Sequence, residues 1–199
     1  MSAIVRLKIV LKDVEPKVIR RIEVPLAIKL DRLHDVLQAV MGWGDYHLYG
    51  FRFRGDVGFG IPDPDWPDDM LDARKASLRS VLEDTDGKTF HHYYDFGDFW
   101  DHVITIERIE PAIRGLTYPI LLQAQGRCPP EDVGGSIGYS EFLEILADPT
   151  HAEYEETLTW AGGHFDPNDI DTNAIDEALL NLANQWAPKR RTKLAHAND

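Results

Sequence analysis

The first two dozen residues carry the hydrophobic period of β-strands. In residues 4–12 every second side chain is apolar and the intervening ones are mostly basic, a pattern typical of a strand with one buried face. A polar break at 13–16 separates this segment from a β-branched run at 18–24, which Pro25 ends. We therefore expect two antiparallel strands that form a hairpin.

A helix is predicted next. Apolar residues recur at helical spacing from Leu33 to Met41, Asp31 is a suitable N-cap, and Gly42 stands where a left-handed C-terminal cap is needed. Residues 47–54 then predict a third strand.

The rest of the chain changes from strand to helical periods. Residues 55–72, rich in aspartate and proline, predict a loop. Beyond it the pattern predicts a helical turn at 77–82, strands at 88–94, 100–109 and 118–123, and helices at 139–147, 151–161 and 172–186. No βαβ series is visible, so we expect an α+β fold: a mostly antiparallel sheet with a ββα start and a central hairpin, packed with a C-terminal helical cap.

The length of 199 residues, 43% of them hydrophobic, suits a single domain with a packed core. We expect this domain to cover residues 4–186, with a sheet part at 4–125 and a helical part at 136–186. Residues 187–199 are predicted to be a basic, flexible tail.

Composition and charge limit the location and the partners that we expect for the protein. No run approaches the roughly 20 apolar residues of a membrane span and no signal peptide is visible, so we expect a cytoplasmic protein with no membrane partner. The single Cys128 excludes an internal disulfide. Residues 1–188 hold 33 of the 34 acidic residues but only 17 of the 21 basic ones. Such an acidic body repels phosphate backbones, so we expect no nucleic-acid partner.

The most unusual segment is an aromatic, histidine and aspartate hairpin at residues 91–102. If Phe96 and Gly97 are the central turn residues, the predicted pairs are Asp95 with Asp98, Tyr93 with Trp100, His92 with Asp101, and His91 with His102. Gly97 is then expected to have a positive φ.

Two interpretations of this hairpin stay open. Histidines opposite each other, with carboxylates at the turn, offer nitrogen and oxygen ligands for a divalent metal such as zinc or manganese. Alternatively, His102 is a hydrogen-bonded core residue, and Asp95 and Asp98 are ordinary turn residues.

Two further segments offer chemistry. Residues 41–51 combine glycines, aromatic residues and His47, which suits either a ligand pocket or a glycine-capped core. The loop at 126–135 presents Cys128, Glu131 and Asp132. A nucleophilic cysteine needs a neighbouring base, and the two carboxylates either bind metal, act as acid and base, or fix the loop.

These segments define two sets of candidates. The predicted pocket residues are Trp43, His47, Tyr93, Trp100 and Cys128. The candidate metal ligands are His47, Asp95, Asp98, His102, Glu131 and Asp132. No cofactor is predicted outright, and a divalent metal stays an open alternative.

The combination of segments resembles the plasmid pRiA4b ORF-3-like family, also described as insertion-element passenger (TnpR-like) proteins. The similarity covers residues 4–180, and Tyr49 stands where the family typically has a second histidine after His47 and Leu48. Its carriers are the segments 19–25, 33–43, 46–48, Phe51, 94–98, Trp100, His102, 128–135 and 138–139. The resemblance implies an α+β fold and no established reaction.

Three functions follow from these observations. The leading hypothesis is a non-enzymatic ligand- or protein-binding domain, associated with a plasmid or mobile element, that uses the cleft between sheet and helical cap. The alternative is a metal-dependent hydrolase built on the His, Asp and Glu candidates. Resolvase activity is rejected, because Ser2 is the only early serine and the body is acidic.

Overall fold

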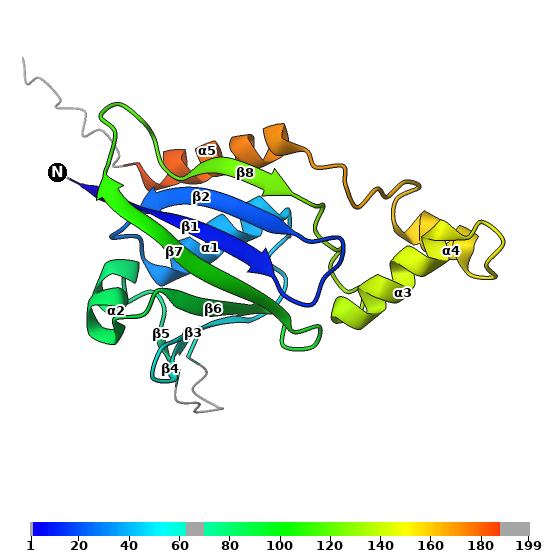
Figure 1. Ribbon diagram of the computed structural model, residues 1–199, viewed down its shortest axis with the longest axis horizontal. Helices are drawn as coiled ribbons and strands as arrows, with labels where there is room; N and C mark the ends of the chain where they lie inside the picture. The colour runs from blue at the N-terminus through cyan, green and yellow to red at the C-terminus, as the bar shows by residue number, and fades with distance from the viewer. Residues whose placement is uncertain (1, 63–69, 188–199) are drawn as a thin grey trace, which may run out of the picture.

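The computed structural model describes residues 2–62 and 70–187 and consists of one sheet and five helices (Figure 1). The strands are β1 (Ala3–Leu11), β2 (Ile19–Pro25), β3 (Tyr49–Phe53), β4 (Val57–Gly60), β5 (Leu71–Asp72), β6 (Thr89–Tyr94), β7 (Trp100–Pro111) and β8 (Ile120–Gln125). The helices are α1 (Leu30–Met41), α2 (Leu78–Thr85), α3 (Gly135–Ala147), α4 (Tyr154–Trp160) and α5 (Thr172–Trp186).

The eight strands form one sheet in the order β5-β4-β3-β6-β7-β1-β2-β8. All neighbours are antiparallel except β4 and β5. In Figure 1, α1 and α5 lie behind the strands, while α3 and α4 stand beyond one end of the sheet. The predicted α+β class with a mostly antiparallel sheet and a C-terminal helical part is confirmed.

The core lies between the sheet and α1. Alternate residues of β1 are fully buried, as the period of two predicts, and they contact the apolar stripe of α1. The helix ends at Gly42, whose φ of 80° is left-handed and whose N–H bonds the carbonyl of Gln38 at 2.8 Å. This cap was predicted, and it directs the chain back towards the sheet.

The predicted N-cap at Asp31 is wrong. The capping position is Lys29, which is extended because it forms an isolated antiparallel bridge with Ser77. Helical geometry therefore begins at Leu30, and Asp31 lies in the first turn.

The predicted register of the β6–β7 hairpin is also wrong, by one residue. Tyr94 pairs with Trp100 and His92 with His102, while Tyr93 faces Asp101. The turn spans residues 95–99, with positive φ at Asp95 and Phe99 and not at Gly97. The longer turn therefore puts His92, and not His91, opposite His102 in the core, as a slip of one residue must.

Two short strands were missed. Residues 55–72 were predicted to be a loop, yet β4 and β5 extend the sheet at its edge. Part of that loop (63–69) and the predicted basic tail from residue 188 onward lie outside the described residues. The subdivision of the chain into a sheet part, a helical part and a tail stays a prediction.

Among residues 2–62 and 70–187, no helix combines the length and the apolar character that crossing a membrane requires.

Candidate metal centre

The loop at residues 42–48, between α1 and β3, is hydrogen-bonded to the loop that follows β8. The indole Nε1 of Trp43 donates to the carbonyl of Pro129 at 2.9 Å, and the N–H of Gly44 donates to Oε2 of Glu131 at 2.7 Å. The Tyr94 hydroxyl accepts from the N–H of Tyr46 at 3.0 Å and donates to Oε1 of Glu131 at 2.5 Å. These bonds give the loop one defined position, and hence define where His47 projects.

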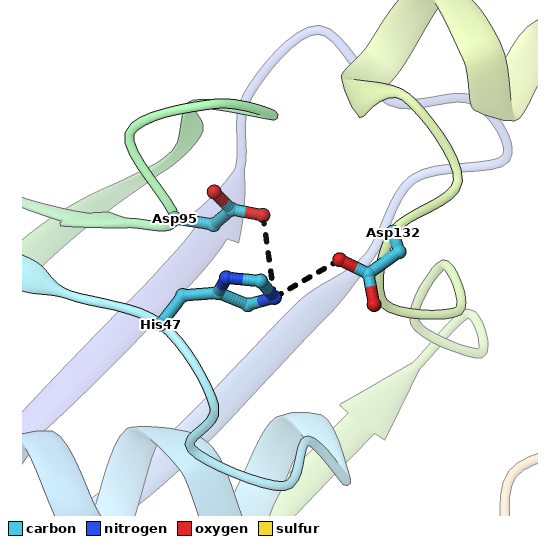
Figure 2. Close-up of side chains that lie close together, drawn as sticks. All are labelled: His47, Asp95 and Asp132. Carbon is cyan, nitrogen blue, oxygen red and sulfur yellow. Dashed lines mark ion pairs between the residues drawn. The ribbon is translucent and has the colours of Figure 1, made fainter.

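His47 lies between two carboxylates (Figure 2). Its Nε2 is 3.0 Å from Oδ1 of Asp132 and 3.6 Å from Oδ2 of Asp95. One ligand atom from each residue can be chosen so that all three lie within 4.8 Å of one another. The three residues come from three loops, so only the tertiary fold brings them together.

The local backbone conformation orients the carboxylates of Asp95 and Asp132. Asp95 has a φ of 56° and Asp132 a φ of 60°, a left-handed conformation that aspartate tolerates better than most residues. Oδ1 of Asp95 accepts from the N–H of Gly97 at 2.9 Å, which leaves Oδ2 directed at His47. The imidazole also packs edge-on against Tyr94, with ring centroids 5.8 Å apart.

The Nε2 atom of His47 is shielded from solvent but makes no hydrogen bond of acceptable geometry with any described residue. A buried nitrogen without a partner is costly. A divalent cation would satisfy it, because a neutral imidazole nitrogen and two carboxylate oxygens are ligands that zinc and manganese accept. The side chain of Asp132 is 68% exposed, so such an ion would have access to solvent.

The other candidate ligands do not face the same point. Glu131 is held by Gly44 and Tyr94. Asp98 accepts from the N–H of Gly134 at 3.1 Å, which ties the β6–β7 turn to the start of α3. His102 is fully buried against His92.

A chain of three buried histidines runs beside this centre, and its members His34 and His92 were not among the predicted site residues. Oδ1 of Asp45 accepts from Nε2 of His34 at 2.7 Å, which leaves Nδ1 of His34 to accept from Nε2 of His92 at 2.9 Å. His102 in turn contacts His92, through its Nδ1 and the carbonyl of His92 at 3.0 Å. The one sequence feature that could have identified His34 is its position on the apolar stripe of the predicted helix.

Burial keeps these histidines neutral. Desolvation lowers the pKa of His34 despite the opposing effect of Asp45, and it lowers the pKa of His92 well below its ordinary value. The pKa of His102 falls to about 4, mainly through desolvation. The three histidines therefore carry no charge at neutral pH.

A cavity of 980 Å³ lies between α1, the loop after β8 and the helical part. Its lining includes the predicted pocket residues Trp43 and Cys128, together with Glu131 and Asp132. Tyr93 lies instead at a separate groove with Phe99, and Trp100 is in the core. The cavity thus adjoins the His47 centre through Asp132.

The Cys128 thiol does not meet the requirements of a nucleophile. Its Sγ is buried and accepts from the Arg20 guanidinium at 3.3 Å. Burial nevertheless raises the pKa of the thiol to about 11. The group therefore stays protonated at neutral pH.

Comparisons with known proteins agree on the family. The family profile described as plasmid pRiA4b ORF-3-like protein matches residues 3–174. The uncharacterized protein y4hQ of Sinorhizobium fredii is 52% identical over 194 residues, which cover 97% of this chain and 99% of that protein. The crystal structure of MM3350 from Methanosarcina mazei Go1, a protein of unknown function, is similar with a TM-score of 0.78 and 35% identity, over 90% of this chain and 98% of that one. The chain belongs to the plasmid pRiA4b ORF-3-like family.

Proposed function

We propose that the protein is a ligand-binding domain that holds a divalent metal ion with His47, Asp95 and Asp132 at the edge of its cleft. The observation that carries this proposal is the shielded Nε2 of His47, which has two carboxylate oxygens 3.0 and 3.6 Å away and no hydrogen bond of acceptable geometry within the described residues. Three protein ligands leave room in the coordination sphere for water or a bound molecule.

The distances are those of ion pairs, and the same three side chains can converge on a metal ion. Bonds of about 2.0–2.2 Å to a central ion separate neighbouring ligand atoms by roughly 3 to 4 Å, and the three atoms, which lie within 4.8 Å of one another, would have to move closer together around the ion. Two of the three ligands are held by other contacts: the N–H of Gly97 bonds Asp95, and hydrogen bonds of the 42–48 loop position His47. Such supporting contacts are what a preorganised metal site needs.

Calorimetric titration of chelator-treated protein with zinc or manganese tests this proposal. We expect one ion per chain, and His47→Ala should bind at least about 10-fold more weakly. His164→Ala is a matched control, because it removes an exposed histidine outside the centre. If the wild type binds neither ion, or if both variants bind like it, the metal centre is refuted.

A second candidate function is metal-dependent hydrolysis. The observation that favours it is that Glu131 and Asp132 both line the cavity of 980 Å³, so a substrate there would lie beside the proposed ion. The ion would supply Lewis acidity, and Glu131 is positioned to hold a proton. Its two oxygens accept from Gly44 and Tyr94, which fixes the orientation of the carboxylate.

Zinc-loaded protein incubated with p-nitrophenyl phosphate and p-nitrophenyl acetate tests this candidate. We expect Glu131→Gln to lower the rate about 100-fold, which is far more than it weakens zinc binding through the loss of one bond to the 42–48 loop. Glu177→Gln, an exposed change on α5, should leave the rate unchanged. Metal binding without turnover of either ester would leave the binding function standing and remove the hydrolase.

A further inference from the structure

The negative charge of the chain is concentrated in its last third. Residues 128–187 contain 13 of the 34 aspartate and glutamate residues and none of the 21 lysine and arginine residues. The remaining residues carry 21 charges of each sign, so this one segment accounts for the whole net charge of −13. It includes α3, α4 and α5.

A groove of 380 Å³ lies on this segment, between α3 and α4. Its apolar lining consists of Val133, Phe142, Ile145 and Trp160. Its acidic lining consists of Asp132, Glu141, Glu153 and Glu156. Within residues 2–62 and 70–187, no lysine or arginine side chain lines it. The groove is thus an apolar floor with carboxylates around it.

Trp160 is the exposed member of this apolar floor, whereas Phe142 is buried and Val133 and Ile145 are partly buried. The side chain of Trp160 is 52% exposed, although it packs edge-on against Phe142 with ring centroids 5.8 Å apart. Ile137 is not part of the groove lining, but it precedes the lining residue Gly138 and is 75% exposed. Both helices stand beyond the end of the sheet in Figure 1. Exposed aromatic and aliphatic side chains gathered at a groove are typical of a binding surface.

Three of the four carboxylates around the groove lack an ion-pair partner among the described residues, while Asp132 lies 3.0 Å from Nε2 of His47. Among residues 2–62 and 70–187, no ion pair involves Glu141, Glu153 or Glu156. This contrasts with the sheet, where Arg6 pairs with Glu23 and Arg21 with Glu107. A bound partner could therefore supply the missing positive charge.

We propose that the α3–α4 groove binds a basic, amphipathic peptide segment of a partner protein. Apolar side chains of the segment would contact Trp160 and Phe142, and its lysine or arginine side chains would pair with Glu141, Glu153 and Glu156. Charge complementarity favours this occupant over a second copy of the chain, because the same face on another copy is equally acidic. The proposal is independent of the metal centre, apart from the shared position of Asp132.

A fluorescein-labelled peptide of about 14 residues, with leucines on one helical face and lysines on the other, is a direct probe. Its anisotropy is measured against the full chain and compared with that of a peptide carrying glutamates in place of the lysines. We expect only the lysine peptide to bind, and more weakly as salt rises.

Two variants locate the binding. Trp160→Ala should weaken it about 10-fold, and the double change Glu153→Gln with Glu156→Gln about 3- to 10-fold. The matched control neutralises Asp176 and Glu177, adjacent exposed carboxylates of α5 outside the groove, and should bind like the wild type. His47→Ala should also bind the peptide normally, which separates this proposal from the metal centre.

Four results would overturn the proposal. The first two are no binding of the lysine peptide and equal binding of the glutamate peptide. The third is an equal loss of binding in the α5 control, which would indicate diffuse attraction to an acidic protein. The fourth is self-association that Trp160→Ala abolishes, which would show a second copy in the groove. Circular dichroism of each variant confirms that it is folded.

Discussion

The sheet with α1 and the helical region from residue 128 onward differ in how they use charge and burial. The sheet and α1 bury nearly all their inward side chains, including three histidines and Arg20, and some of their surface charges form ion pairs, such as Arg6 with Glu23. In the helical region α4 has no buried residue and α5 has two, while carboxylates stand unneutralised. The first region therefore holds most of the buried core, and the second carries the groove that is proposed to bind a peptide. The proposed metal centre lies where the two meet.

The largest expected effect compares the two regions directly. Phe90 is 1% exposed and stacks on Phe53 at 4.6 Å, so Phe90→Ala should lower the free energy of unfolding by about 3–5 kcal/mol. Trp160→Ala removes a larger but half-exposed side chain and should cost only about 1 kcal/mol. Urea unfolding measures both. Equal costs would contradict the division into a stabilising and a binding region.

A smaller effect concerns pH and belongs to the sheet region. In the folded protein the pKa values of three histidines lie below the ordinary value: His34, His92 and His102. Below about pH 6.5 the unfolded state therefore binds more protons than the folded state. Stability is therefore full above about pH 6.5 and falls towards pH 4, by about 1.4 kcal/mol per pH unit for each histidine that stays neutral. Urea unfolding at several pH values shows the slope.

One neighbouring group opposes this trend. Desolvation, together with Asp31 and Asp45, raises the pKa of Asp35 to about 6, so protonation of Asp35 favours folding as the pH falls. Asp35→Asn should therefore make the loss of stability with acid steeper. A flat profile in that variant would show that the histidines are not held neutral by the fold.

Local features of the fold were predictable from the sequence. The alternation in β1, the helical stripe of α1 and the Gly42 cap depend on neighbouring residues, and the structure has them. The bounds of α5 also match the prediction of 172–186. These features follow from periodicity and capping alone.

Features that depend on distant contacts were not predictable. The bridge between Lys29 and Ser77 decides where α1 begins, and the five-residue turn at 95–99 decides which histidines enter the core. Sequence chemistry selected His47, Asp95 and Asp132 among six candidate ligands, but it gave no reason to separate them from the rest. The convergence of three loops made that distinction.

The central claim is the divalent metal centre, and anomalous diffraction from crystals grown with zinc tests it most directly. We expect an anomalous difference peak about 2.0–2.2 Å from Nε2 of His47 and from one oxygen each of Asp95 and Asp132. Crystals of His47→Ala should show no such peak. A well-ordered wild-type crystal with no peak at these three residues, or with zinc bound only elsewhere, would contradict it.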